Sequence, residues 1–308
     1  MRPIAPPAAK WGFVPPAAHL RGVSKRFGSF VALDSIDLAV AAGEIRGFLG
    51  PNGAGKTTAM RILVGLLRAD GGEVSLLGGD PWSEPGVRSE LGFLPSDPGL
   101  YGRMRGGDLL DHFAALSGRP PVLREAACAH LRFTDDDLAR PVRTYSKGMR
   151  QKLGVLQAVQ HDPALLILDE PGEGLDPLVM SGLVALLRDR RDAGRAILFS
   201  SHVLAEVEAL CDAVTMIRGG RIVGAGTIGE IARRRSRQVV VEVADPAAAI
   251  ELPGCEPIDR TGGRATFSHR GEVGPLLAAL AALDPVDVRI QEASLDEVFM
   301  EYYGEAAP

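Results

Sequence analysis

Gly50-Pro51-Asn52-Gly53-Ala54-Gly55-Lys56-Thr57-Thr58 is the stretch that decides the fold of this chain. It matches the phosphate-binding pattern G-x-x-x-x-G-K-[ST] at every position. Residues 44–49 before it predict a buried strand, and residues 57–67 after it predict a helix. A glycine-rich loop between a strand and a helix presents backbone N–H groups and a positive helix N-terminus to a phosphate. We therefore expect an α/β fold organised around a bound nucleoside triphosphate.

The polar side chains of this loop have separate expected roles. Lys56 would reach the β- and γ-phosphates, and the Thr57 hydroxyl would be a ligand of Mg2+. The alternative is a glycine-rich turn that contains a lysine by chance, and it explains neither flanking element. The residues expected to surround the nucleotide are Gly50, Asn52, Gly53, Ala54, Gly55, Lys56, Thr57 and Thr58.

The composition indicates a chain with a substantial core and no broad basic surface. It has 308 residues, of which 46% are hydrophobic and 24% charged, as is ordinary for globular proteins. The net charge of −5 argues against non-specific binding to nucleic acid, which needs a basic face, so no nucleic-acid partner is expected. The three cysteines are far apart and predict neither a zinc site nor a disulfide framework.

Residues 1–18 are rich in proline and alanine and predict a flexible tail. They lack the continuous apolar core of a signal peptide. The most apolar stretch elsewhere, 276–283, is far shorter than the roughly 20 residues that a membrane-spanning helix needs. Any service to a membrane would therefore go through a partner.

Two strands, 20–26 and 31–40, are predicted before the phosphate loop, with a turn at Gly28-Ser29 between them. Phe27 lies at this turn. Its ring could stack on a purine, because every base presents a π-face. Taken alone, burial for packing is the better explanation of an aromatic residue at a strand end.

A helical insertion is predicted after two further strands, 73–77 and 91–94. The second of these strands ends at Pro95-Ser96-Asp97. From 101 to about 160 the apolar spacing becomes helical. This region would form a helical subdomain inside the α/β core.

Ser146 precedes the last helix of that insertion and allows two interpretations. Its side-chain oxygen fits an N-cap, which accepts a hydrogen bond from a backbone N–H of the first turn. The same helix N-terminus, with Gly148 allowing close approach, could instead be a second anion site. The spacing alone favours neither interpretation.

Leu165-Leu166-Ile167-Leu168 is an unbroken apolar run that predicts a central parallel strand, buried on both faces. Asp169 and Glu170 follow it at the edge where ligands bind in open α/β sheets. Asp169 could hold Mg2+, as a ligand or behind one, and Glu170 could orient and deprotonate an attacking water. The alternative, that both acids cap the next helix, is the poorer explanation in a chain that also carries the phosphate loop.

Further strands at 196–200, 214–218 and 221–225 are predicted to complete the core. His202 follows the first of them and could hydrogen-bond a γ-phosphate. A lone histidine is more often structural, so this prediction depends on its position at a strand end rather than on its residue type. The core domain would span 19–235. From 236 to 308 the pattern changes to short strands and helices, which predicts a small α+β domain.

The ordered set of motifs resembles the ATP-binding subunit of ABC transporters over about residues 18–230. The loop at 50–58 matches the Walker A motif, and residues 165–170 match Walker B with its catalytic glutamate. Residues 145–151, Tyr-Ser-Lys-Gly-Met-Arg-Gln, resemble the signature motif. Residues 174–177, Gly-Leu-Asp-Pro, match the D-loop, and His202 matches the switch histidine. The set is far more specific than any one of its members.

This resemblance implies a fold and a mechanism. The expected fold is α/β, a P-loop ATPase core with a mostly parallel sheet and an antiparallel β subdomain, a helical insertion and a small C-terminal α+β domain. ATP and Mg2+ are the expected cofactors, with Thr57 and Asp169 at the metal and Glu170 and His202 as catalytic residues. Phe27 takes the adenine-stacking position. In a head-to-tail dimer the ATP would also be contacted from the second subunit by Ser146, Lys147, Gly148, Met149 and Asp176.

The chain departs from the commonest family pattern in three places. Ser96, followed by Asp97, stands where the Q-loop usually has Gln or Glu. A serine cannot reach Mg2+ as a longer side chain does, so Asp97 is the candidate substitute. Lys147 stands in place of a signature glycine, and Gly172 and Glu173 replace the more usual Thr-Ser before the D-loop.

Within the superfamily, the signature and the closing segment 293–299 resemble the bacterial drug-export branch, similar to the daunorubicin-resistance ATPase. In that branch the permease is a separate polypeptide. The resemblance implies a dimer, of this chain or with a related ATPase, at the cytoplasmic face of the cell membrane. It would power export of a drug or other amphiphilic compound through a separate polytopic membrane permease.

The alternative function is that of a soluble ABC-type ATPase acting on nucleic acid or ribosomes. Such proteins usually carry two cassettes in one chain, or long coiled-coil or zinc insertions. This sequence has one cassette, no heptad tract and no zinc cysteines, so export is the favoured prediction.

Overall fold

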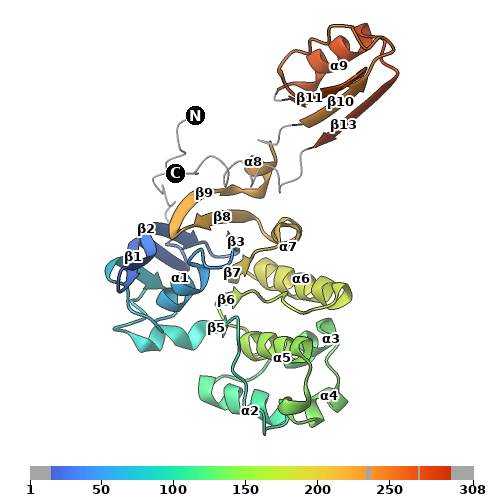
Figure 1. Cartoon of the computed structure of the whole chain (residues 1–308). Helices are drawn as coiled ribbons and strands as arrows, with labels where there is room; N and C mark the ends of the chain where they lie inside the picture. The colour runs from blue at the N-terminus through green and yellow to red at the C-terminus, as the bar shows by residue number, and fades with distance from the viewer. Residues whose placement is uncertain (1–14, 234–236, 270, 293–308) are drawn as a thin grey trace. The chain divides into compact units, whose positions relative to one another are not determined.

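The computed structural model describes residues 15–233, 237–269 and 271–292 and divides the chain into two compact units, Met1–Thr227 and Ile228–Pro308 (Figure 1). The sequence predicted a boundary between residues 235 and 236. In the structure the division precedes helix α8 (Ile228–Arg233), which therefore groups with the second unit.

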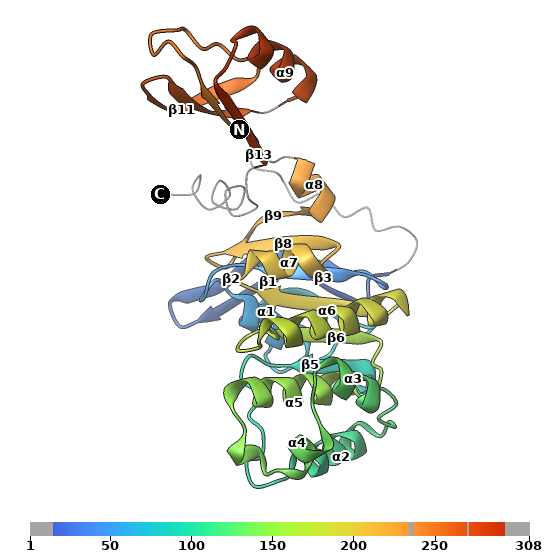
Figure 2. The same ribbon diagram turned by 90° about the vertical axis from the view of Figure 1, so that its right-hand side faces the viewer.

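A six-stranded sheet forms the centre of the first unit (Figures 1 and 2). Its strand order is β5-β6-β7-β3-β8-β9, and every neighbouring pair is parallel except β8 with β9. Every residue of β6 and β7 is buried, as expected for parallel strands covered on both faces. The strands are β3 (Ile45–Leu49), β5 (Leu91–Leu94), β6 (Leu165–Asp169), β7 (Ala196–Ser201), β8 (Ala213–Arg218) and β9 (Arg221–Thr227).

The register of this sheet brings the predicted motifs to one edge. Leu49, at the end of β3, is opposite Ser201 of β7. Asp169, at the end of β6, is opposite Ser200. Because parallel strands end on the same side, the phosphate loop, the Asp169-Glu170 pair and His202 all begin at the carboxyl edge, where ligands bind in open α/β sheets.

A three-stranded antiparallel sheet, in the order β2-β1-β4, covers one side of this core. Helix α1 packs with both sheets, and the three share one hydrophobic cluster that includes Leu38, Phe48, Met60 and Leu198. These elements are β1 (Ala18–Phe27), β2 (Phe30–Val40), β4 (Gly71–Leu76) and α1 (Lys56–Leu63).

Helices α6 (Pro177–Asp192) and α7 (Leu204–Leu210) contact the central sheet at β7, and α7 also contacts β3 (Figure 1). The approach of α7 is close. A Cβ at Gly47 of β3 would lie 2.8 Å from a methyl group of Val207, so a larger residue at position 47 would push the helix away.

The helical insertion is present, and α5 joins it to the core through its contacts with β5 (Figure 1). Tyr145 is buried in this subdomain and donates a hydrogen bond of 2.5 Å to the Asp137 carbonyl. Its helices are α2 (Gly106–Ser117), α3 (Arg124–His130), α4 (Asp135–Ala139) and α5 (Lys147–Val159), with the 3-10 turn η2 (Val142–Thr144) before α5. A further 3-10 turn, η1 (Pro85–Glu90), lies outside the insertion, before β5.

The second unit is a four-stranded antiparallel sheet, in the order β11-β12-β10-β13, with helix α9 packed on it. Leu276 and Leu280 of the helix share a cluster with Val239, Val241 and Phe267 of the sheet, so this unit has a core of its own. Its elements are α8, β10 (Arg237–Glu242), β11 (Cys255–Thr261), β12 (Arg264–His269), α9 (Val273–Ala282) and β13 (Asp287–Glu292).

The structure differs from the sequence predictions in a few elements. The helix after the phosphate loop ends at Leu63 rather than at residue 67, because Gly65 takes a left-handed conformation with φ 72°. Strand β11 was not predicted, and strand β1 already begins at Ala18, inside the predicted tail. The helix predicted at 295–303 lies outside the described residues. Among the residues that the structure describes, no helix is long and apolar enough to cross a membrane.

Candidate active site

The phosphate loop joins β3 to α1 and depends on its glycines. Gly53 has φ 80° and Gly55 has φ 112°, both in the left-handed region that disfavours other residues. A Cβ at Gly55 would also lie 2.8 Å from the Ala32 carbonyl oxygen. Gly55 is the N-cap of α1 and supplies no capping side chain, so the first N–H groups of this helix are available to a phosphate.

Lys56 is almost completely buried, with 5% of its surface exposed. Its ammonium donates hydrogen bonds to the carbonyl oxygens of Gly50, at 2.5 Å, and Pro51, at 3.4 Å. The same nitrogen lies 3.1 Å from Glu170 Oε1. A buried cation needs such partners, and they hold it across the mouth of the loop, where the terminal phosphates of a nucleotide would lie.

Thr57 and Asp169 meet at the start of α1. The Thr57 hydroxyl donates to Asp169 Oδ2 at 2.7 Å, and Asp169 Oδ1 accepts from the Ser200 hydroxyl at 2.6 Å. Asp169 is 1% exposed. The hydroxyl and carboxylate oxygens are hard donors of the kind that Mg2+ prefers, and two of them beside a phosphate cradle fit a cation that keeps further oxygens from substrate and water. Within the described residues no group of three or more His, Cys, Asp or Glu side chains is arranged for a metal ion.

Glu170 occupies the centre of the site. One carboxylate oxygen faces Lys56, and the other, Oε2, lies 2.8 Å from His202 Nδ1. The backbone of Glu170 is in the left-handed region, with φ 53°, which is strained for a residue with a side chain. Two hydrogen bonds hold it there: its N–H donates to Ser200 Oγ at 2.9 Å, and its carbonyl accepts from Gln151 Nε2 at 2.9 Å.

Phe27 ends β1 at the hairpin turn and is half exposed, at 50%. The interpretation of Phe27 as an ordinary core residue is therefore wrong. The Lys25 ammonium lies 5.6 Å from the centre of its ring, a cation–π distance. The exposed ring remains a candidate platform for a base.

The arrangement can perform one kind of chemistry. A buried lysine, a helix N-terminus and a pair of oxygen donors lie at the place where the phosphates are expected to bind. A carboxylate beside an imidazole stands at the same edge of the sheet. This set fits hydrolysis of a phosphoanhydride by an activated water.

Comparison with known proteins agrees with this chemistry. The family model described as "ABC transporter" matches residues 33–173. The chain is 40% identical over 209 residues to an uncharacterized ABC transporter ATP-binding protein, YdbJ, of Bacillus subtilis, covering 67% of this chain and 68% of the relative. The chain belongs to the ABC transporter ATP-binding proteins. It is thus the ATP-binding, ATP-hydrolysing subunit of such a transporter.

Two relatives match this ABC subunit along almost its whole length. It is 34% identical over 302 residues to the Nod factor export ATP-binding protein I of Cupriavidus pinatubonensis, covering 93% of this chain and 90% of the relative. It is 33% identical over 304 residues to the daunorubicin resistance ATP-binding protein DrrA3 of Streptomyces coeruleorubidus, covering 94% and 96%. A solved ATP-binding subunit of an ABC transporter superposes with a TM-score of 0.66 at 29% identity, over 70% of this chain and 92% of that one. The predicted P-loop ATPase fold is confirmed.

The signature and D-loop residues of this ABC subunit lie at helix N-termini. Ser146 caps α5 and accepts from the Met149 N–H at 3.2 Å, so capping occurs, and the anion-binding role of the same N-terminus stays a prediction. Gly148 allows close packing, because a Cβ there would lie 2.6 Å from the Gly174 carbonyl oxygen. Asp176 caps α6, and the hydrogen bond from the Val179 N–H lowers the pKa of its carboxyl group.

Lys147 and Glu173 form an exposed ion pair with each other. Both stand where the chain departs from the commonest family pattern. The pair joins the start of α5 to the turn that follows Glu170.

No described hydrogen bond links the Q-loop candidates, Ser96 and Asp97, to the predicted Mg2+ ligands. Asp97 is exposed and accepts from the N–H of Gly99 at 3.3 Å, within its own loop. The hydrogen bonds of the described residues join neither Ser96 nor Asp97 to Thr57 or Asp169.

The sequence predictions missed two residues that shape this ABC site, Ser200 and Gln151, both of which hold the backbone of Glu170. Ser200 lies at the end of a predicted strand, and Gln151 lies inside the signature motif at 145–151. Their contacts depend on which strand and helix are neighbours of β6, which neither residue type reveals.

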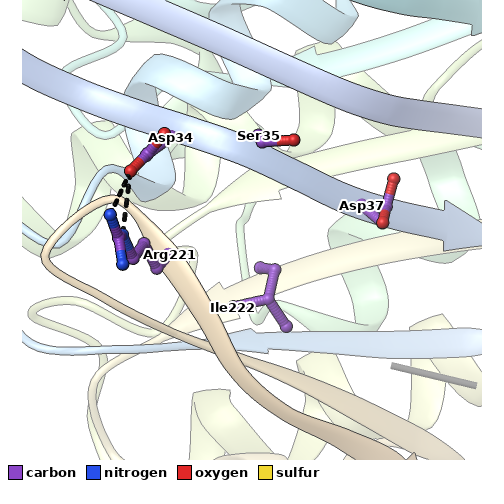
Figure 3. A pocket seen from close by; sticks show the side chains of 5 residues that line it. All are labelled: Asp34, Ser35, Asp37, Arg221 and Ile222. Atoms are coloured by element: carbon purple, nitrogen blue, oxygen red, sulfur yellow. Dashed lines mark hydrogen bonds and ion pairs between the residues drawn. The ribbon is translucent and has the colours of Figure 1, made fainter. Parts of the chain in front are cut away.

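A shallow hollow elsewhere on the first unit is lined by Asp34, Ser35, Asp37, Arg221 and Ile222 (Figure 3). Arg221 pairs with Asp34 across it, at 2.6 Å. It shares no residue with the predicted nucleotide site.

Proposed function

We propose that this chain hydrolyses ATP to power export of a drug or other amphiphilic compound through a separate membrane permease. The observation that carries the hydrolytic part is the position of Glu170, whose carboxylate lies between Lys56 and His202 at the carboxyl edge of the sheet. The relatives named for Nod factor export and for daunorubicin resistance, which match nearly the whole chain, support the export part.

Nucleotide binding would rearrange the contacts of Lys56. Before the nucleotide arrives, the Lys56 ammonium lies 3.1 Å from the Glu170 carboxylate. A γ-phosphate that enters the loop competes with this carboxylate for the ammonium, because both are anions. Glu170, released from Lys56, is then free to accept a proton from an attacking water, with general-base catalysis contributing about 10²–10⁴-fold. His202, 2.8 Å from the other carboxylate oxygen, would hold the carboxylate and the γ-phosphate in place.

Thr57 and Asp169 would hold Mg2+, which when bound neutralises phosphate charge. Ser200 orients Asp169 through its hydrogen bond of 2.6 Å. Because Asp169 is buried, its carboxylate has little freedom to rotate.

The residues expected to contact ATP from a second subunit are far from Lys56 in the sequence. None of them is among the described contacts of Lys56. Ser146, Lys147, Gly148, Met149 and Asp176 lie at the N-termini of α5 and α6, and Ser146, Lys147 and Asp176 are exposed. A second subunit, of this chain or of a related ATPase, would place these N-termini against the γ-phosphate, where helix N-termini favour an anion. ATP would then join the two subunits, and hydrolysis would release them.

The subunit would reach the membrane through its partner, the permease. The helical subdomain, about 101–160, would pass the opening and closing of the dimer to the permease. The subunit would accordingly lie at the cytoplasmic face of the cell membrane, held there by the permease.

Purification from native membranes tests the export proposal. A tagged chain would be isolated from gently solubilised membranes, with untagged cells as the control, and partners present in stoichiometric amount would be identified. A polytopic membrane protein is the expected partner. If ribosomes, nucleic acid or only soluble proteins come down instead, the export proposal is wrong, while the ATPase activity stands.

A further inference from the structure

Glu206, on helix α7, is a partly buried acid beside the site that the hydrolysis mechanism does not use. Its Oε2 accepts a hydrogen bond from the Ser201 hydroxyl at 2.6 Å. Ser201 is completely buried and is the residue immediately before His202. The contact therefore acts on the backbone turn that carries the histidine.

The hydroxyl of Ser201 has one proton and two acceptor lone pairs. Besides Glu206, it contacts both backbone groups of Val203: it accepts from the N–H at 2.9 Å and lies 3.3 Å from the carbonyl oxygen. Because the proton goes to the nearer acceptor, Glu206, a lone pair is left pointing at the Val203 N–H. Glu206 thereby selects the hydroxyl orientation that closes the turn from 201 to 203 around His202.

The same carboxyl group packs against the turn that follows Glu170. A Cβ built on Gly172 would lie 2.6 Å from Glu206 Oε1, closer than real Cβ atoms come, and 3.0 Å from its carboxyl carbon. The carboxyl group thus fills the space that a side chain at 172 would need. Gly172 is one of the places where this chain departs from the commonest family pattern, which has Thr there.

These contacts form a closed loop of interactions. Glu206 touches Gly172 and Ser201, Gly172 lies two residues after Glu170, Ser201 lies next to His202, and His202 meets Glu170 at 2.8 Å. The electrostatics agree with this proximity: burial, and to a smaller extent the charge of Glu170, raise the pKa of Glu206, while the hydrogen bond from Ser201 and the charge of His202 lower it.

We propose that Glu206 is a positioning residue for His202: its carboxyl group, seated against Gly172, fixes the Ser201 hydroxyl and so holds the imidazole at Glu170. This inference rests on the hydrolytic roles proposed for Glu170 and His202 and is independent of the export proposal. The described contacts of Glu206 are with Ser201 and the Gly172 position. Its effect on hydrolysis goes through His202.

The rate of ATP hydrolysis by the full-length chain tests this role. It is measured for the single variants Glu206→Ala, Glu206→Gln and His202→Ala, and for the double variant that combines Glu206→Ala with His202→Ala. Glu206→Ala is expected to lower kcat about tenfold, the size of loss typical when a partner that orients a functional side chain is removed. ATP affinity, measured by equilibrium binding, should stay within about twofold, because no phosphate contact changes. Glu206→Gln should retain most of kcat, because its amide oxygen can accept from Ser201.

The double variant separates positioning from a general structural role. If Glu206 acts through His202, Glu206→Ala has no further effect on kcat in the His202→Ala background. Losses that multiply in the double variant, or a Glu206→Gln variant as slow as Glu206→Ala, would overturn the proposal. If His202→Ala alone leaves kcat unchanged, the hydrolytic role proposed for His202 fails, and this inference fails with it.

Gly172→Ala provides an independent test. The new methyl group must displace the end of the Glu206 side chain, so kcat should fall in the otherwise unchanged chain. In the Glu206→Ala background the space is free, and Gly172→Ala should have no further effect. Gly86→Ala, at a glycine with open space around it, is the matched control and should leave kcat unchanged. An equal loss from Gly172→Ala in both backgrounds would contradict the seating of Glu206 at this position.

Discussion

The exposure of Phe27 in the structure agrees with the prediction that its ring stacks on a base. An aromatic ring at a strand end is usually part of a core, yet this one is 50% exposed at a hairpin turn. The resemblance to ABC subunits predicts that this ring stacks on the adenine. An exposed ring beside a nucleotide site stabilises a complex through stacking, a contribution of about 1–3 kcal/mol per base.

Phe27→Ala should therefore weaken ATP binding by that 1–3 kcal/mol, about fivefold to 150-fold in Kd. Phe27→Tyr keeps the ring face and should bind within about twofold of the unchanged chain. The measurement is equilibrium binding of ATP, with thermal unfolding to show that both variants fold. Equal affinities for the alanine and tyrosine variants would remove Phe27 from the site.

Glu170 and its neighbours show what could be predicted at the scale of residues. The unbroken apolar run 165–168 was enough to place Asp169 and Glu170 at a strand end, and the phosphate loop was recognisable from its own pattern. The support of Glu170 by Ser200 and Gln151 was not predictable in this way. It requires knowing that β7 lies between β6 and β3, and that α5 approaches the end of β6.

At the scale of elements, helices α3 and α6 approach each other at a glycine. A Cβ at Gly182 of α6 would lie 1.9 Å from the carbonyl oxygen of His130, at the end of α3. The obstacle is backbone, which cannot rotate away as a side chain can. Overpacking of this kind costs about 1–3 kcal/mol.

Gly182→Ala is accordingly expected to reduce the free energy of unfolding by about 1–3 kcal/mol. Gly107→Ala, in helix α2, meets its nearest neighbours at ordinary distances of 3.6 and 3.8 Å and is the matched control. It should be neutral or slightly stabilising, because alanine has the higher helix propensity. Urea unfolding of both variants measures the difference, and equal stabilities would show that α3 moves aside freely.

Asp162, in the turn after α5, links that turn to α6 and to Arg195, the residue before β7. Its carboxylate accepts from Arg195 Nη2 at 2.5 Å and lies 3.4 Å from Arg190 Nη1 of α6. Burial disfavours ionisation of Asp162, but the hydrogen bond and charge of Arg195 and the charge of Arg190 outweigh it and lower the pKa of its carboxyl group. A carboxyl whose pKa is lower in the folded than in the unfolded chain stabilises the fold above the unfolded pKa and loses that effect as pH falls through the folded pKa.

Asp162→Asn should therefore lower the free energy of unfolding by about 1–2 kcal/mol at neutral pH, a value reduced for the partial exposure of the group. Asparagine accepts the same left-handed backbone, φ 51°, so the loss reports the charge. The difference in the free energy of unfolding between the variant and the unchanged chain should be constant above about pH 5 and should become smaller below about pH 4. Urea unfolding across this range checks it, and a gap independent of pH would contradict the assignment to ionisation.

Elements were predicted well where the apolar pattern was strong and poorly where it was weak. The central strands of the first unit are buried on both faces and were recognised as apolar runs. Strand β11, Cys255–Thr261, has almost every residue exposed and contains Pro257, so neither alternation nor propensity indicates it. It forms in the structure because it pairs with β12 at the edge of the second sheet.

At the scale of the whole molecule, the two units have separate cores. The large cluster of the first unit and the cluster of the second share no residue. Every predicted site residue lies in the first unit. We therefore expect a single subunit to bind the nucleotide without the unit Ile228–Pro308.

A chain that ends at Thr227 should fold and bind ATP with a Kd within about threefold of the full-length value, because no nucleotide contact is removed. Circular dichroism and equilibrium binding check the two statements. A folded fragment that no longer binds ATP would assign the second unit a part in the nucleotide site. Turnover and assembly of the same fragment would show what the second unit adds.

The central claim, that Glu170 activates the water that attacks ATP, is tested most directly by Glu170→Gln. The amide keeps the shape of the side chain and its place beside Lys56 but cannot accept the proton. ATP binding should persist while hydrolysis falls at least about a hundredfold. Glu73→Gln, at an exposed surface ion pair, is the control and should hydrolyse normally. Parallel measurement of ATP binding and turnover decides the matter: bound ATP without turnover supports the account, and near-normal turnover in Glu170→Gln contradicts it.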